Sequence, residues 1–334
     1  MAITLKDIAK MAGVGTATVE RVINGRGGVR PQLAAKVLDA ARRLQYRKTL
    51  PSLHRGIMRI EVLMLRPELS FIARMSHSFE RLAASLDPSI AVHRTILSEV
   101  TPQEIAARIS DPRFRRAALI VAVPDHPAVR EALRAEQDKG VVIIQLISPV
   151  EALQTDYVGI DNQAAGRMAG LLMTGMQRSA GSVVALFHSQ AYAVHRARIQ
   201  GFSHFMAKPE AAHLNFSLAA FTYDNDQEAA KIVSSLIRST PDLVGVYSTG
   251  GDYGPLCEML RRTPQETPLC LIGHELTAQN AAAIRDGTIT AIIDQTPEAQ
   301  ARRSLDLALY RLGLLDTAVD TSPIRFITIT AENL

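Results

Sequence analysis

The stretch that decides the amino-terminal fold runs Thr4-Leu-Lys-Asp-Ile-Ala-Lys-Met-Ala-Gly-Val-Gly-Thr-Ala-Thr-Val-Glu-Arg-Val-Ile-Asn24. In its first half, apolar residues recur at the spacing of one helical face: Leu5, Ile8, Ala9 and Ala12. Thr4 can cap this helix, and Gly13 can end it because glycine tolerates left-handed backbone. The pattern therefore predicts a short amphipathic helix that stops at Gly13.

Thr16 can cap a second helix that follows directly. Its buried face would consist of Val19, Val22 and Ile23. The pair Asn24-Gly25 breaks this helix, and Pro31 suits the first turn of a third. The apolar stripe of the third helix would be Leu33, Val37, Leu38, Ala41 and Leu44. Two short helices joined by a tight glycine-containing turn, with a third helix after them, are the layout of a helix-turn-helix DNA reader.

The distribution of charge supports this interpretation of the head. Residues 1–60 hold 12 Lys and Arg against 3 Asp and Glu, whereas the other 274 residues hold 25 against 30. The net charge of +4 for the whole chain therefore hides a basic head on a mildly acidic body. A basic head suits contact with phosphates and the release of counterions from DNA. The alternative, three core helices without a partner, does not account for this asymmetry.

Length and composition limit what the rest of the chain can be. Of the 334 residues, enough remain beyond the head for one large or two medium α/β lobes. No apolar run reaches the roughly 18–20 residues of a membrane span, and no secretory signal is recognised, so we expect a cytoplasmic protein without membrane contact. Cys257 and Cys270 form neither a disulfide framework nor a zinc cluster, and we expect no metal and no cofactor.

From Ile60 onward, apolar runs of strand length alternate with amphipathic helical stretches. Strands are expected at 60–65, 118–123, 141–146, 157–160, 182–187, 214–222, 243–248, 269–273, 290–294 and 325–330. Helices are expected at 76–85, 101–109, 128–139, 162–176, 195–206, 226–239, 254–261, 277–286 and 297–312. This alternation predicts parallel sheets with helices on both faces. Two similar lobes that face a cleft are more economical than one very wide sheet.

Motifs along most of the chain point to one family. In the head they are segments 4–9, 12–25, 29–31 and 40–46; in the body they are 158–167, 198–202, 273–275, 294–295 and 332–334. Together they resemble the LacI-type transcriptional regulators, the lactose, galactose and purine repressor family. The resemblance implies an α/β fold with an N-terminal helix-turn-helix DNA-binding domain and a two-lobed domain, with parallel sheets, like the type I periplasmic binding proteins of the ribose type. It also implies a homodimer in which each head reads half of a near-palindromic operator in double-stranded DNA.

The resemblance also suggests the division of the chain into domains. Residues 1–47 would form the head, 48–59 a hinge, and 60–334 the effector-binding and dimerisation domain. Within that domain, the N-lobe would comprise about 60–157 and 295–320. The C-lobe would comprise about 160–290 and 322–334, with a small ligand bound between the two lobes.

Roles in DNA binding follow from matched positions. The residues that would face base edges in the major groove are Thr16, Ala17 and Arg21. The residues that would position the head on phosphates are Thr4, Thr18 and Asn24. Arg21 could meet guanine O6 and N7 together, and Leu53 matches the hinge leucine that wedges into the minor groove and kinks the duplex.

The head and hinge also differ from the family pattern. Gly15 stands where the N-cap of the recognition helix is usually Ser, and Glu20 stands where the family has a phosphate-facing Ser. Gly28 replaces a side chain that reads bases in several relatives. The hinge is a few residues shorter than usual and lacks the Ala-Arg pair before Ser52-Leu53. These differences bear on the operator sequence and on the geometry of the hinge, not on DNA binding itself.

Loops at the carboxyl ends of parallel strands should line the cleft. The expected ligand-binding residues are Ser70, Phe71, Asp125, Ser148, His188, Arg196, Arg198, Asp252, Glu275 and Gln295. Donors, acceptors and an aromatic face suit a sugar, cyclitol or sugar derivative, while His188, Arg196 and Arg198 allow an anionic ligand. Three of these residues have plainer alternatives: Asp125 could cap the helix that starts at Pro127, Phe71 could be core, and Arg198 could have a structural role.

The expected function is a sequence-specific transcriptional regulator, a repressor, whose operator affinity depends on the small ligand. The alternative is a solute-binding protein of a sugar transport system, which the basic head and the missing signal peptide disfavour. We expect no enzyme and no catalytic residues, because phosphate-binding loops, nucleophile elbows and zinc-protease motifs are absent from the sequence. From the catabolic bias of the family, we expect the ligand to release DNA rather than to be required for binding.

Overall fold

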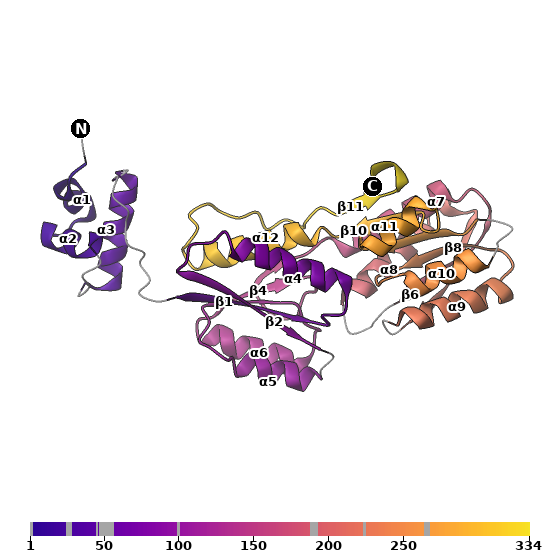
Figure 1. Cartoon of the computed structure of the whole chain (residues 1–334), viewed down its shortest axis with the longest axis horizontal. Coiled ribbons are helices and arrows are strands. Elements are labelled where there is room, and N and C mark those ends of the chain that lie inside the picture. The colour runs from indigo at the N-terminus through magenta and orange to yellow at the C-terminus, as the bar shows by residue number, and fades with distance from the viewer. Residues whose placement is uncertain are drawn as a thin grey trace. The chain divides into compact units, whose positions relative to one another are not determined.

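The computed structural model describes residues 3–24, 29–44, 46, 57–98, 101–187, 193–222, 225–263 and 268–334. The chain forms two compact units. The first comprises Met1–Met58 with Asp87–Ala91, and the second comprises Arg59–Leu86 with Val92–Leu334. The head belongs to the first unit, and both lobes of the body belong to the second (Figure 1).

The head contains three helices: α1 (Leu5–Ala12), α2 (Thr16–Ile23) and α3 (Pro31–Arg43). Thr4 caps α1 through a reciprocal pair of bonds, since its hydroxyl accepts from the Asp7 N–H and the Asp7 carboxylate accepts from the Thr4 N–H at 2.8 Å. Gly13 ends α1 in the left-handed conformation, with φ 65°. Ile8, Val19 and Val37, one from each helix, are fully buried together. The predicted three-helix layout is confirmed.

The first lobe is built on a five-stranded sheet in the order β2-β1-β3-β4-β5. Its strands are β1 (Met58–Leu65), β2 (Ile90–Leu97), β3 (Ala118–Val121), β4 (Val142–Leu146) and β5 (Asp156–Val158). Its helices are α4 (Ser70–Ala83), α5 (Pro102–Ser110), α6 (Pro127–Asp138) and α12 (Pro297–Arg311). Helices α5 and α6 cover one face of the sheet, and α4 and α12 cover the other (Figure 1).

The second lobe is built on a six-stranded sheet in the order β11-β10-β9-β8-β6-β7. Its strands are β6 (Gly181–Phe187), β7 (Leu214–Phe221), β8 (Leu243–Ser248), β9 (Cys270–His274), β10 (Ala291–Asp294) and β11 (Ile327–Ile329). Its helices are α7 (Asn162–Met176), α8 (Ala193–Met206), α9 (Asp226–Ser239), α10 (Gly254–Arg262) and α11 (Ala278–Arg285), with short 3-10 turns at Pro209–Ala211 and Ala331–Asn333. The β10–β11 pair is antiparallel, whereas the other pairs of this sheet and the β1–β3, β3–β4 and β4–β5 pairs of the first sheet are parallel.

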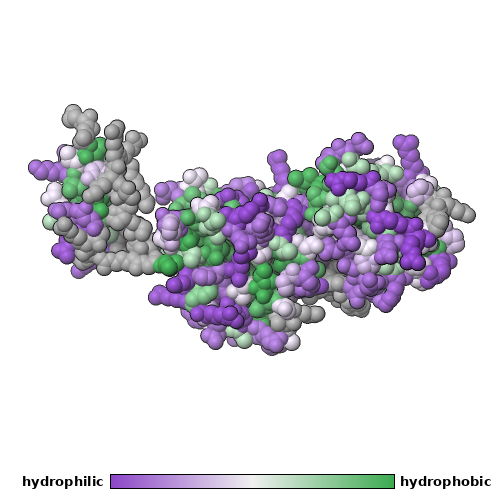
Figure 2. Space-filling model, in the orientation of Figure 1, coloured by the Kyte–Doolittle hydropathy of each residue, from purple (hydrophilic) through white to green (hydrophobic). Residues whose placement is uncertain are grey.

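The chain passes between the lobes at three places: after β5, after β10 and after α12. Two of these segments pair with each other, at Ile160 and Ile324. The central strands are buried along their whole length, as in β3, β8 and β9, because helices cover both faces of each sheet. Outside, hydrophilic and hydrophobic residues are interspersed over the face shown in Figure 2.

Two elements of the first lobe differ from the sequence-based prediction. Strand β2 was not predicted, because His93, Arg94 and Thr95 break its apolar pattern; it lies at the edge of the sheet, where most of its side chains are only half-buried. Helix α4 begins at Ser70, six residues before the predicted start at Ser76. Among the described residues, no helix combines the length and the apolar character needed to cross a membrane.

Candidate ligand cleft and DNA-reading head

Strand ends of both lobes meet in a cleft within the second unit. Its polar lining residues are Arg66, Ser70, Ser148, His195, Arg198, Asp226, Asp252, Glu275 and Gln295. The remainder of the lining is Leu65, Leu69, Phe71, Ile72, Ala122, Leu146, Ile147, Val194, Gly250 and Gly251. The cleft encloses about 930 Å³ of space, part of it open to solvent, which is in the range of small-molecule sites.

Seven of the ten predicted ligand residues lie in this lining: Ser70, Phe71, Ser148, Arg198, Asp252, Glu275 and Gln295. Arg196 and Asp125 are not part of it. The Asp125 carboxylate instead pairs with Arg130 through two bonds of 2.5 Å, which hold the pKa of Asp125 below its ordinary value. The alternative that Asp125 caps helix α6 is wrong, since the N-cap is His126. His188 lies outside the described residues.

Arg198 reaches the cleft from α8 and is only 2 % exposed. Its Nε donates to Asn162 Oδ1 at 2.8 Å, and its Nη1 donates to the Thr249 carbonyl at 2.5 Å. Its Nη2 has no hydrogen-bond partner among the described residues. The guanidinium is therefore fixed by the protein and keeps donor capacity for a ligand.

Close packing of α7 against α8 sets the position of Arg198. A Cβ at Gly166 on α7 would overlap the Arg198 carbonyl oxygen, and a Cβ at Gly201 on α8 would overlap the Gln163 carbonyl oxygen. Only glycine lets the two helix backbones approach this closely. Helix α8 is thereby held where Arg198 can bond both Asn162 at the start of α7 and the loop after β8.

Glu275 follows strand β9 in the left-handed conformation, with φ 68°. Its Oε1 accepts from Gln295, its carbonyl accepts from Asn280 Nδ2 at 2.9 Å, and its Oε2 has no partner within the described chain. Burial raises the pKa of Glu275 to about 7, although nearby Arg198 opposes the shift. Left-handed backbone in a residue other than glycine costs energy and is typical of functional positions.

Ser148 presents a third buried polar atom to the cleft. It is 1 % exposed, and its Oγ finds no partner among the residues that the structure describes. Ile147, just before it, has φ 68°, and its carbonyl accepts from the Tyr157 hydroxyl at 2.8 Å. Ser148, Arg198 and Glu275 thus present a hydroxyl, a donor and an acceptor that no described residue pairs, and buried polar atoms without partners are rare in folded proteins.

The hydrogen bond between Ser70 and Asp252 crosses the cleft between the lobes. Ser70, at the start of α4 in the first lobe, donates from its hydroxyl to Asp252 Oδ2 in the second lobe at 2.8 Å. Ser70 and Asp252 were both predicted from the sequence. Three polar lining residues were not predicted: Arg66, His195 and Asp226. Arg66 directly follows β1 with φ 63°, and its position at a strand end was the signal that could have found it.

In the head, the predicted base-reading residues lie on the outer face of α2. Thr16, Ala17 and Arg21 are exposed, opposite the buried face of the same helix. Of the predicted phosphate-contacting residues, Asn24 is exposed and Thr18 is half-buried, while Thr4 is engaged in capping α1. Gly15 is the N-cap of α2 and supplies no side-chain bond to it. Leu53 lies outside the described residues.

Two family models match the chain. The one described as bacterial regulatory proteins of the lacI family matches residues 4–48, and the one described as periplasmic binding protein domain matches residues 113–313. The ribose import binding protein RbsB of Salmonella typhimurium is 22% identical over 63% of this chain and 71% of its own length. Catabolite control protein A of Priestia megaterium is 35% identical over 25% of this chain and 26% of its own length.

Solved structures share the fold of the body. The myo-inositol binding protein of Caulobacter aligns with a TM-score of 0.71 at 18% identity, over 84% of this chain and 95% of its own. A periplasmic solute binding protein from Actinobacillus succinogenes, solved with D-allose, aligns with a TM-score of 0.71 at 16% identity, over 82% of this chain and 98% of its own. The chain therefore carries a helix-turn-helix head of the lacI family of bacterial regulatory proteins, and its body, which makes up most of its length, belongs to the periplasmic binding protein domain family.

Proposed function

We propose that this protein is a sequence-specific transcriptional repressor whose affinity for operator DNA is set by a small ligand in the cleft. The observation that carries the proposal is a set of three buried polar atoms in the cleft, on Ser148, Arg198 and Glu275, that have no partner among the described residues, in a chain with a DNA-reading head. A cleft with unsatisfied polar groups favours a ligand that completes their hydrogen bonds. Because the chain also has a helix-turn-helix head, such a ligand could change the affinity of the protein for operator DNA.

The ligand that suits the cleft best is a neutral polyol, that is, a sugar, a cyclitol or an uncharged derivative. Neighbouring hydroxyls of a polyol can accept from Arg198 and donate to Glu275, because each hydroxyl does both. Similar proteins point the same way, since RbsB is named for ribose and two structural neighbours were solved with D-allose and myo-inositol. An anionic ligand is less favoured, because Arg196 is not in the lining and three carboxylates are.

The head would read DNA through the outer face of α2. In this proposal, the side chains at base edges are Thr16, Ala17 and Arg21. The contacts to phosphates come from Thr4, Thr18 and Asn24. Leu53, in the proposed hinge of residues 48–59, would wedge into the minor groove at the operator centre. Two heads on a homodimer would bind the two operator half-sites.

Control of DNA binding would be a population shift. Ligand would favour the closed cleft and change the arrangement of the two N-lobes in the dimer, so that the hinges lose their docked geometry. The ligand would then act as an inducer rather than a corepressor. The protein would act without catalysis and in the cytoplasm, where its operator is.

A thermal-shift screen tests the ligand class. Purified protein is heated with D-ribose, D-allose, myo-inositol and, as anionic comparison, ribose 5-phosphate. A ligand that binds only the folded state raises the melting temperature as its concentration rises. We expect at least one neutral polyol to do so in the wild type but not in Arg198→Ala. A response to ribose 5-phosphate alone would contradict the neutral-polyol assignment.

A further inference from the structure

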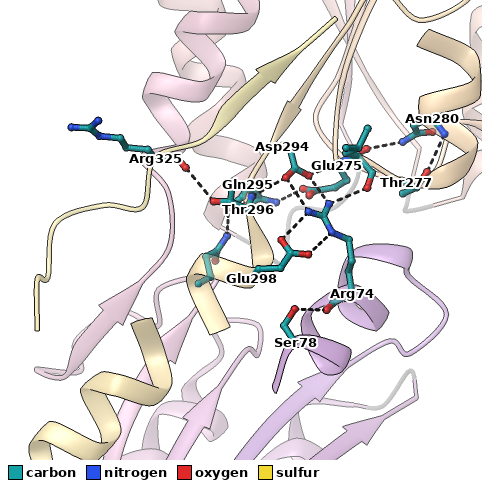
Figure 3. Close-up of polar contacts among 12 residues, drawn as sticks. Arg74, Ser78, Glu275, Thr277, Asn280, Asp294, Gln295, Thr296, Glu298 and Arg325 are labelled. Carbon is teal, nitrogen blue, oxygen red and sulfur yellow. Dashed lines mark hydrogen bonds and ion pairs between the residues drawn. The ribbon is translucent and has the colours of Figure 1, made fainter. Parts of the chain in front are cut away.

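The side chain of Arg74, on α4, is the centre of a polar network beside the cleft (Figure 3). Its Nη1 donates to Asp294 Oδ1 at 2.7 Å and to the Leu276 carbonyl at 2.9 Å. Its Nη2 donates to Asp294 Oδ2 at 3.2 Å and to Glu298 Oε2 at 2.9 Å, and its Nε donates to Glu298 Oε1 at 2.9 Å. Every N–H that a guanidinium offers is therefore used.

The three acceptors belong to different parts of the fold. Leu276 lies between β9 and α11 in the second lobe, Asp294 ends β10, and Glu298 lies in the first turn of α12. Because α4 belongs to the first lobe, a single side chain joins that lobe to the second lobe and to the segment that crosses between them. Asp294 strengthens the junction by accepting from the Leu276 N–H at 3.0 Å and from the Thr296 N–H at 3.2 Å.

This junction holds two residues of the cleft by their neighbours. Glu275 precedes Leu276, Gln295 follows Asp294, and the side chains of Glu275 and Gln295 are bonded to each other. Figure 3 shows the Arg74 guanidinium beside this pair of segments. Two further side chains hold the backbone of this pair. Asn280 donates to the Glu275 carbonyl, and Gln300 donates to the Gln295 carbonyl, both at 2.9 Å.

Because Asp294 is buried, its carboxylate depends on the positive charge of Arg74. Its side chain is 4 % exposed, whereas those of Arg74 and Glu298 are 30 % and 42 % exposed. A buried carboxylate needs its cationic partner, because the charge is otherwise left without compensation. The Arg74 bonds are charge-assisted and bidentate to both acids, which is the geometry in which arginine cannot be replaced by lysine without loss.

We propose that Arg74 is a positioning residue of the ligand cleft: it ties the two lobes in the closed arrangement and holds Glu275 and Gln295 where a ligand meets them. The inference rests on the proposed function only for the statement that a ligand meets these residues. The bonds between the lobes are made by the protein without ligand or DNA. The closure can therefore be measured even if the proposed function is wrong.

The test uses the bond across the cleft as a reporter. Ser70 and Asp252 are replaced by cysteine in the full-length protein, and the rate at which a short bifunctional methanethiosulfonate links the two thiols is measured. Single-cysteine variants give the background, since Cys257 and Cys270 are buried. Arg74→Met in the double-cysteine protein should lower the linking rate about tenfold, because the closed arrangement would be less populated. Arg74→Lys should restore only part of that rate.

Arg261→Met is the matched control, because Arg261 also bonds a carboxylate twice, that of Asp286, but within one lobe. It should leave the linking rate unchanged. If Arg74→Met fails to fold, as judged by circular dichroism, Arg74→Lys takes its place; it keeps a positive charge beside Asp294, loses the bidentate bonds and should lower the rate severalfold. Rates for Arg74→Met, or for Arg74→Lys in its place, equal to that of Arg261→Met would overturn the proposal.

Discussion

At the scale of the residue, the chemistry of the cleft is concentrated in Glu275. This carboxyl group is buried, has one oxygen without a partner in the described chain and has a pKa raised to about 7 by burial. The motif Gly273-His-Glu275 after a predicted strand was enough to place it in the cleft from the sequence. Its left-handed backbone and its bond to Gln295 could not be predicted, since they depend on segments that only the folded chain brings together.

The raised pKa of Glu275 predicts a specific dependence of stability on pH. The folded state holds the proton up to about pH 7, and the unfolded state releases it near the ordinary value of 4.5. Below both pKa values the carboxyl group is protonated in the folded and in the unfolded state, so its ionisation does not change the free energy of unfolding. As the pH rises between them, the unfolded chain releases a proton that the folded protein must keep, so the free energy of unfolding falls, by up to about 3 kcal/mol once the pH is above 7. Glu275→Gln should therefore raise the free energy of unfolding, by an amount that grows from about pH 4.5 to about pH 7 and is largest above it.

Urea denaturation of both proteins at several pH values between about pH 5 and pH 8 measures this difference. The gain from Glu275→Gln should be smallest at the acid end and should grow toward the alkaline end. A gain or loss that is the same at every pH would mean that Glu275 is not titrating in the folded protein.

At the scale of the element, the pattern of apolar residues predicted most helices and strands, but not the polar contacts between their side chains. The alternation of apolar runs and helical stretches predicted the central strands correctly. Helices cover both faces of each sheet, so these strands are buried, and apolar, along their whole length. It missed β2, and it started α4 at Ser76 instead of Ser70. Arg74 was thereby left outside any helix, and nothing in its own sequence neighbourhood pointed to Asp294, 220 positions away.

The close approach of α7 and α8 predicts that Gly201→Ala is destabilising. The added methyl group would overlap the Gln163 carbonyl and push α8, with Arg198, away from α7. We expect a loss of about 1–3 kcal/mol in urea unfolding. Gly175→Ala, on α7 with open space around its Cβ, is the control and should be neutral or stabilising by up to about 1 kcal/mol. Equal effects of the two substitutions would argue against this packing.

The exposed face of α2 predicts the effect of Arg21→Ala on DNA binding. If Arg21 contacts guanine, its loss should cost about 1–3 kcal/mol at one base pair per half-site and relax preference there, with little change on unrelated DNA. Competition binding with operator variants measures this. Arg43→Ala, at an exposed position near the end of α3, is the control and should keep the base preference. Unaltered discrimination in Arg21→Ala would remove this residue from the base-reading set.

At the scale of the whole molecule, the sequence predicted the family, the head, the two-lobed α/β body and most of the cleft. It succeeded where a residue follows a strand, as for Ser148 and Glu275. It also predicted Asp125 as a ligand residue, but Asp125 is not part of the cleft lining, and its carboxylate is bonded to Arg130, five positions along the chain. Whether a strand-end residue faces the cleft depends on such local partners, and these are decided only when the side chains pack.

The measurement that tests the central claim most directly is operator affinity with and without the polyol that raises the melting temperature, for the wild type and Arg198→Ala. In the wild type, saturating polyol should weaken operator binding by about 5–150-fold, the usual range of coupling between sites. Arg198→Ala should bind the operator as tightly as the wild type and should not respond. A wild type whose operator affinity ignores the polyol, or a variant that responds like the wild type, would contradict the account.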